Sequence, residues 1–149
     1  MTGDRLATRR RWLPLSVGYS GTPLAKKLGI KPGMSIALLH APQHLPQLLG
    51  ELPEGVTINT RLTERVNLVL IFFQRAGDLA SDVPALKSAI APDGMVWVAW
   101  PKRASTLPTD ITEDVIRQLV LPAGLVDVKV CAIDQTWSGL KVVIRKELR

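Results

Sequence analysis

One stretch of the sequence constrains the fold more than any other. Residues 66–73 form an apolar run that is broken only by Asn67. A run without alternation of apolar and polar residues is typical of a central strand of a parallel sheet, which helices cover on both faces. Shorter apolar runs at 34–39 and 95–100, each preceded by a turn with glycine, predict two more buried strands. We therefore expect the chain to fold around a parallel sheet.

The segments between and after these strands predict an α/β order. We expect a short helix that Ser20 or Thr22 caps and Gly29 ends, and further helices at 43–52, at 78–90 and from Thr109 or Asp110. An Asp110–Glu113 capping box would start the last helix. Strands are expected at 56–62, 125–133 and 140–145. Strands that alternate with helices imply right-handed crossovers, and the short connector 134–139 predicts a final antiparallel hairpin.

Charge divides the chain into two parts. Residues 1–31 hold seven basic groups and one acid, which account for the whole net charge of +6, because twelve basic and twelve acidic residues cancel in the remainder. We expect residues 1–17 to be a basic, flexible N-terminal arm and 18–149 to be a single domain. The arm could dock on nucleic acid by releasing counterions, or it could be a solubilising leader.

The remaining composition narrows the setting. No apolar run approaches the roughly 18 residues that cross a membrane, so no membrane partner is expected. The single cysteine, Cys131, can form no internal disulfide, which fits a cytoplasmic location. His40, His44 and Cys131 lack a compact ligand spacing, so no metal site is predicted.

Several segments of the sequence resemble those of known families. The element order, together with the turn-and-strand phrases 29–34 and 90–98, resembles the class I methyltransferase fold, here with a trimmed sheet. The phrases 19–29, 97–102 and 134–141 resemble a family of small bacterial proteins catalogued as a domain of unknown function. That resemblance covers roughly residues 18–149. It implies a bacterial origin and a methyltransferase-like, Rossmann-like fold, and it implies no activity.

Two positions argue against the usual cofactor of that fold. The turn after the first strand is His40-Ala41-Pro42-Gln43, where cofactor-binding versions carry glycines that let the backbone approach the ligand. The second strand ends at Asn59-Thr60-Arg61, where an acid would bind ribose hydroxyls. S-adenosylmethionine is therefore an unexpected ligand, and no cofactor is predicted.

A ligand, if there is one, should lie beyond the carboxyl ends of the strands. We expect an anionic small molecule there, with Lys102 contacting it and Trp137 or Trp100 stacking on it. The candidate binding residues are Lys102, Trp137, Ser138, Asp134, Trp100, Arg61, Arg75 and His40. A second anion clamp could form at the first helix from Tyr19, Ser20, Thr22, Lys26 and Lys27. The alternatives are solvated cations, a Trp137 that closes the core, and an ordinary helix cap.

These expectations favour a non-catalytic binding or regulatory module. No catalytic set is predicted, because His40, a candidate general base, has no evident nucleophile beside it, and the helix start explains Asp110, Glu113 and Asp114, which could otherwise act as acid or base. One alternative is a divergent transferase that uses a nucleotide-type ligand. Another is a nucleic-acid-associated protein that docks through its arm.

Overall fold

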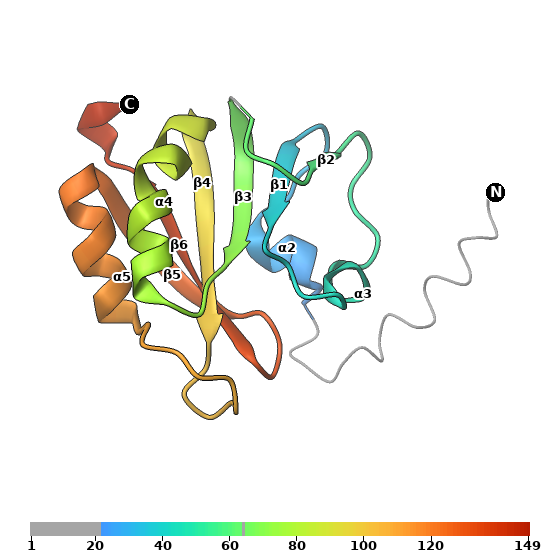
Figure 1. Cartoon of the computed structure of the whole chain (residues 1–149). Helices are drawn as coiled ribbons and strands as arrows, with labels where there is room; N and C mark the ends of the chain where they lie inside the picture. The colour runs from blue at the N-terminus through green and yellow to red at the C-terminus, as the bar shows by residue number, and fades with distance from the viewer. Residues whose placement is uncertain (1–21, 64) are drawn as a thin grey trace.

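A computed structural model describes residues 22–63 and 65–149 and contains one six-stranded sheet in the order β2-β1-β3-β4-β6-β5 (Figure 1). Neighbouring strands from β2 to β4 pair in parallel, whereas β6 is antiparallel to both β4 and β5. The expected trimmed, mostly parallel sheet with an antiparallel C-terminal hairpin is confirmed. The strands are β1 (Ser35–Leu39), β2 (Thr57–Asn59), β3 (Val66–Phe72), β4 (Ile90–Pro101), β5 (Leu125–Ala132) and β6 (Trp137–Ile144).

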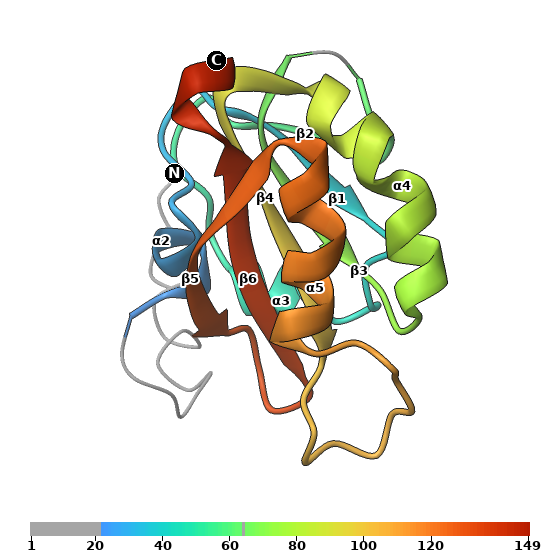
Figure 2. The same cartoon turned by 90° about the vertical axis from the view of Figure 1, so that its left-hand side faces the viewer.

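Helices cover the sheet on both faces, as Figure 2 shows from its edge. The two short helices α2 (Leu24–Leu28) and α3 (Leu45–Leu49) lie on one face. The longer helices α4 (Ala76–Ala89) and α5 (Glu113–Val120) lie on the other. Short 3-10 turns follow α5 (Leu121–Ala123) and end the chain (Lys146–Leu148). The sheet thus separates two apolar cores, one under each pair of helices.

The central strand is buried as its sequence predicts. Every residue of β3 except Asn67 is buried, because β1 and β4 flank it and helices cover both of its faces. Asn67 Oδ1 accepts a hydrogen bond from the backbone N–H of Ser35 at 2.8 Å, so the one polar residue of the run ties β3 to the start of β1. Trp97 of β4 is fully buried, and its Nε1 donates to the Leu28 carbonyl oxygen at 2.8 Å. That bond fixes α2 on the sheet.

Several element boundaries differ from the predicted ones. The helix expected at 43–52 is only α3, which has Pro46 in its first turn and ends at Gly50, and the strand expected at 56–62 is only β2. The last strand begins at Trp137, three residues before its predicted start, because residues 137–142 pair with β4. The apolar pattern alone did not reveal this pairing, since Ser138 and Gly139 interrupt it.

Two predicted helix caps are wrong. The Asp110–Glu113 capping box does not form; α5 begins after Thr112, whose Oγ1 accepts from the Val115 N–H at 3.2 Å. The N-cap of α2 is Pro23, with no side-chain capping bond, although Gly29 ends that helix in the left-handed region as expected. Within residues 22–63 and 65–149, no helix has the length and apolarity that crossing a membrane requires.

Candidate functional site

The strand order places β2 on one side of β1 and β3 on the other, so the sheet has a topological switch point at β1. From β1 the chain moves outward to β2 and then returns to the other side of β1 to form β3. Loops at the carboxyl ends of two such strands diverge, and this is where open α/β sheets bind ligands. A cleft of about 650 Å³ lies there, in the usual size range of a small-molecule site. It is lined by His40, Phe72, Phe73, Gln74, Arg75, Asp78, Ser81, Asp82, Pro108, Thr109 and Asp110.

Hydrogen bonds hold the two walls of the cleft together. Gln74, which follows β3, accepts from Thr109 Oγ1 through its carbonyl oxygen at 2.6 Å and donates through Nε2 to the Pro108 carbonyl at 3.1 Å. Asp110 Oδ1 accepts from the Ala76 N–H at 2.7 Å, so it caps the start of α4. The segment between β4 and α5 is therefore fixed against the β3–α4 turn, and the cleft has a defined shape.

His40 enters the cleft from the glycine-free turn. Its φ of 55° lies in the left-handed region, which costs a residue with a side chain about 1–2 kcal/mol. Its ring meets Phe73 edge-to-face, with ring centroids 5.6 Å apart and planes at 81°. The turn thus adopts a glycine-like backbone without glycine, and a side chain occupies the space that glycine would leave open.

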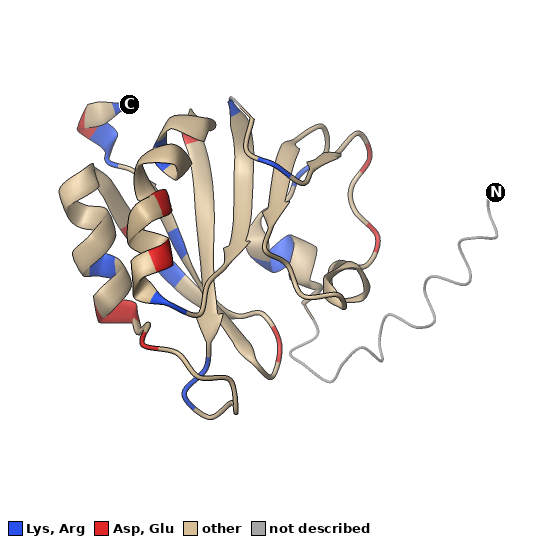
Figure 3. Cartoon of the chain, viewed as in Figure 1, with Lys and Arg blue, Asp and Glu red and all other residues tan. Residues whose placement is uncertain are grey.

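The cleft carries an excess of acid. Asp78 and Asp82 lie on the first turns of α4 and Asp110 lies opposite, whereas Arg75 is the only lysine or arginine in the lining. Figure 3 shows the acidic positions along α4. The arrangement can bind hydroxyl groups or a positive charge, beside the aromatic rings of Phe72, Phe73 and His40.

The opposite side of the rim is filled by side chains. Trp137 is 8% exposed and packs edge-to-face on Phe72, with centroids 5.0 Å apart and planes at 88°. Trp100 is 7% exposed and belongs to the core under α4 and α5. Neither ring offers an open face on which a ligand could stack. Lys102 is half-buried, and its backbone N–H donates to the Thr136 carbonyl at 2.7 Å.

Asp134 is turned inward to stabilise its own loop. Its side chain is buried, and Oδ1 accepts from the backbone N–H groups of Thr136 and Trp137, both at 2.8 Å. Its Oδ2 lies 2.8 Å from His44 Nε2, which joins the β5–β6 loop to the start of α3. Nothing in the sequence around His44 predicted this contact. The Asp-x-Thr-Trp spacing was the available signal, because aspartate often bonds the backbone two residues on.

The remaining predicted ligand residues are spread over the rim. Arg61 is exposed beyond β2, and Ser138 pairs with Trp100 in the β4–β6 ladder. Of the eight predicted residues, the structure brings His40 and Arg75 together in the cleft lining and places the other six outside it.

The described residues of the expected anion clamp at the first helix do not gather at one site. Tyr19, Ser20 and the arm at 1–17 lie outside the described residues. Thr22 precedes α2 and Lys26 lies in the middle of this five-residue helix, and both are exposed. Lys27 instead donates from Nζ to the Ala132 carbonyl oxygen at 3.0 Å, which ties α2 to β5.

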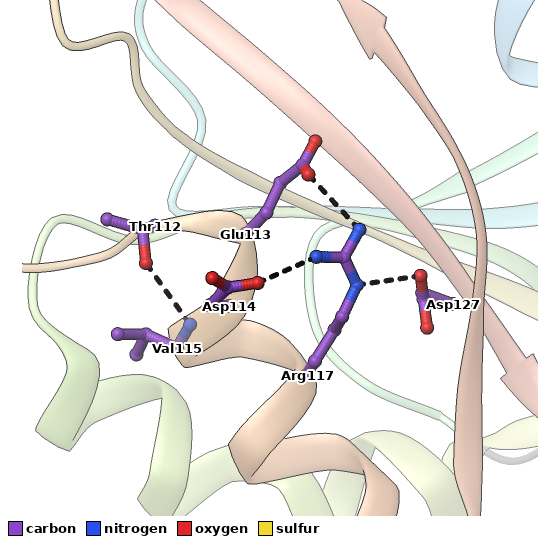
Figure 4. Close-up of polar contacts among 6 residues, drawn as sticks. All are labelled: Thr112, Glu113, Asp114, Val115, Arg117 and Asp127. Carbon is purple, nitrogen blue, oxygen red and sulfur yellow. Dashed lines mark hydrogen bonds and ion pairs between the residues drawn. The ribbon is translucent and has the colours of Figure 1, made fainter.

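The acids at the start of α5 serve an ion cluster rather than a site (Figure 4). Arg117 bonds Asp127 of β5 through Nε at 2.9 Å, Asp114 at 2.9 Å and Glu113 at 3.1 Å. The hydrogen bond from Arg117 lowers the pKa of Asp127, and the same bond is the main cause that raises the pKa of Arg117. The cluster fastens α5 to β5.

Neither a metal centre nor a reactive thiol is evident in the part of the chain that the structure describes. Among residues 22–63 and 65–149, no three histidine, cysteine or acidic side chains gather as metal ligands would. Cys131 is half-buried, and burial raises the pKa of its thiol, which disfavours the reactive thiolate.

The comparisons with known proteins agree on fold. The family model described as "Protein of unknown function (DUF3052)" matches residues 25–146. No curated protein is similar enough in sequence to match the chain. Among solved structures, a SAM-dependent methyltransferase from Aquifex aeolicus is 15% identical, with a TM-score of 0.59 over 81% of this chain and 87% of that one. Fibrillarin from Aeropyrum pernix, with natively bound S-adenosyl-L-methionine, is also 15% identical, with a TM-score of 0.53 over 80% and 73%. These likenesses establish a methyltransferase-like fold.

Proposed function

The chain belongs to the DUF3052 family of proteins of unknown function, and we propose that it is a non-catalytic ligand-binding module. Its ligand would be a small molecule held in the cleft between the end of β3 with α4 and residues 108–110, with His40 of the β1 turn at its edge. The observation that carries the proposal is the position of this cleft, at the switch point of the sheet, with a volume of about 650 Å³ and walls joined by hydrogen bonds. A regulatory role would follow if the ligand changed the binding of a partner.

The residues at the ends of β1 and β2 are a poor fit for S-adenosylmethionine, the cofactor that the fold suggests. Pro42 has no N–H to offer, and the His40 side chain occupies the turn where glycines would let a ligand approach. The side chain of Asn59, at the end of β2, is turned back to donate to Ser35 Oγ and the Ile36 carbonyl. Asn59-Thr60-Arg61 offers no carboxylate for ribose hydroxyls. We therefore propose that the fold has been kept and this cofactor given up.

The acids of the cleft suggest the chemistry of its ligand. Asp78, Asp82 and Asp110 outnumber the single guanidinium of Arg75. This balance favours a ligand with hydroxyl groups or a positive charge over the anion expected from the sequence. The exposed ring of His40, which packs edge-to-face on the buried Phe73, adds a flat apolar surface beside these acids.

A matched pair of probes tests the site on the full chain. Tryptamine and indole-3-acetate share a flat ring and differ in charge. Titration calorimetry should detect the amine and show weaker binding of the acid. Ser81→Trp should block the cleft, because Ser81 lies in its lining on α4. Ser88→Trp is the control, since Ser88 is exposed on the same helix outside the lining.

The variants separate the possible outcomes. Probe binding that Ser81→Trp abolishes and Ser88→Trp preserves supports the cleft as the site. Binding that both variants keep would place the ligand elsewhere and overturn the proposal. A wider set of metabolites can be screened by thermal shift, where a ligand at 100 times its Kd adds about 2.7 kcal/mol of stability. If no compound of any charge stabilises the chain, the binding-module proposal fails.

A further inference from the structure

Three lysines gather on the face of the β5–β6 hairpin that α5 does not cover. Lys129 of β5 lies directly opposite Lys141 of β6 in the antiparallel ladder, so both side chains point to the same face. Lys27 of α2 reaches this face and bonds the Ala132 carbonyl of β5 at 3.0 Å. Figure 2 shows α2 beside β5, which is the outermost strand of the sheet. We call Lys27, Lys129 and Lys141 the lysine patch.

The patch has no internal counter-charge. No carboxylate of residues 22–63 and 65–149 forms an ion pair with any of the three lysines. The acid nearest in sequence, Asp127, is bound by Arg117 on the other face of the sheet. Like charges placed directly opposite each other in a ladder destabilise a sheet. The Lys129–Lys141 pair therefore does not stabilise the fold.

The electrostatics agree with this geometry. Burial, and then the charge of Lys129, lowers the pKa of Lys141. Lys27 and Lys129 both act on the thiol of Cys131, which lies between them, and their charges oppose the rise in its pKa that burial causes. Three positive charges therefore share one small area, and an anionic partner would relieve their repulsion.

The residue types of the patch fit point contacts with phosphate oxygens. Lysine binds phosphate as a point charge, whereas arginine grips carboxylates and phosphates alike with two hydrogen bonds. The patch contains no arginine. Every tryptophan and phenylalanine of the described ranges is buried, so none of them is available to stack on the unpaired bases of a single strand. The partner that fits is a regular array of phosphates, read without regard to sequence.

We propose that the lysine patch binds the phosphate backbone of double-stranded nucleic acid. Three lysine–phosphate contacts predict a slope of log K against log salt of about −2.7 from the patch alone. The basic residues of the N-terminal sequence precede Lys27 in the same chain and would add to the charge offered to the same polymer. This binding is independent of the cleft.

The experiment compares two variants of the full chain on a 30-base-pair DNA duplex. Lys129→Gln/Lys141→Gln removes two charges from the patch. Arg65→Gln/Arg103→Gln removes two charges from exposed positions outside it and is the matched control. Fluorescence anisotropy at several salt concentrations should show that the patch variant loses about 2 from the magnitude of the salt slope. Its affinity at 0.1 M salt should fall at least about tenfold, with a smaller change for the control.

Each other result contradicts the proposal. If the two variants bind alike, the charge that matters lies outside the patch. If the unaltered chain does not bind duplex DNA, the patch does not serve nucleic acid. If polyglutamate competes as well as DNA at equal charge, the patch is a site for acidic protein. Melting temperatures no lower than that of the unaltered chain, with the same circular dichroism spectra, exclude misfolding of the variants as the cause of a loss.

Discussion

Replacing Asp134 tests how the rim on the α2/α3 side is held closed. Its carboxylate accepts from the N–H groups of Thr136 and Trp137 and contacts His44, all at 2.8 Å. Asp134→Ala removes all three contacts at once. Asp134→Asn keeps an oxygen that can accept from both N–H groups and removes only the charge.

The size of the effect follows from what each partner loses. The Trp137 N–H is buried, so without its acceptor it costs the full desolvation penalty of about 1–3 kcal/mol. Thr136 is half-buried, so water replaces part of its bond. The side chain of His44 is 51% exposed, and its contact contributes about 1 kcal/mol or less. We expect Asp134→Ala to cost about 2–4 kcal/mol, and Asp134→Asn about 1 kcal/mol.

Urea unfolding measures these values. The midpoint should fall without a change in slope, since the loop is a small part of the surface exposed on unfolding. For a chain of this length the melting temperature should fall by roughly 2–4 °C for each kcal/mol. Asp93→Ala, at an exposed acid whose side chain forms no hydrogen bond or ion pair with residues 22–63 and 65–149, should stay within about 0.5 kcal/mol. The reasoning is refuted if Asp134→Ala matches this control, or if Asp134→Asn is as costly as Asp134→Ala.

The remaining predictions concern parts of the fold that position the cleft. Asp127→Asn should destabilise the chain fully at pH 7 and progressively less below about pH 4, because Arg117 lowers the pKa of the folded carboxyl and its stabilisation is lost as the carboxyl is protonated; a pH-independent cost in urea melts would contradict this. Trp97→Phe should cost about 2–4 kcal/mol, through an unpaired Leu28 carbonyl and a cavity, and unchanged calorimetric stability would argue against that bond. Gly94→Ala should cost about 1–3 kcal/mol, because its Cβ would lie 3.0 Å from two backbone oxygens; a neutral effect on the melting temperature would show that the backbone of β4 shifts to make room.

The sheet could be predicted because buried strands require runs of apolar residues, which are visible in the sequence. The apolar run at 66–73 and the turns before residues 34 and 95 placed three central strands, and all three are present. Strand ends were less certain, since the start of β6 depends on pairing with β4 rather than on its own apolar residues. The helix expected at 43–52 was too long, because the apolar residues Leu45 to Leu49 mark only the observed α3 and do not show that Gly50 ends it.

The site could be predicted only as an edge of the sheet. Strand order placed His40 and Arg75 at neighbouring carboxyl ends, and they do share the cleft. A ligand was expected between Lys102 and Trp137, but Trp137 packs on Phe72 instead. Residue type alone does not distinguish a tryptophan that stacks on a ligand from one that fills the core. Of the acids that line the cleft, Asp110 was predicted to start a helix, and Asp78 and Asp82 were not predicted as site residues. Asp110 does cap a helix, but the helix is α4, which lies more than thirty residues earlier in the chain. Local sequence patterns do not encode a contact between such distant segments.

The central proposal is that this methyltransferase-like sheet has given up its cofactor and keeps the cleft at the carboxyl end of β3 for another ligand. The most direct test is a titration of the isotope-labelled full chain with S-adenosylmethionine, followed by amide NMR. The account predicts that the amides of residues 40–43 and 59–61 do not shift in a saturable way at millimolar cofactor. Saturable shifts at those two turns would contradict it.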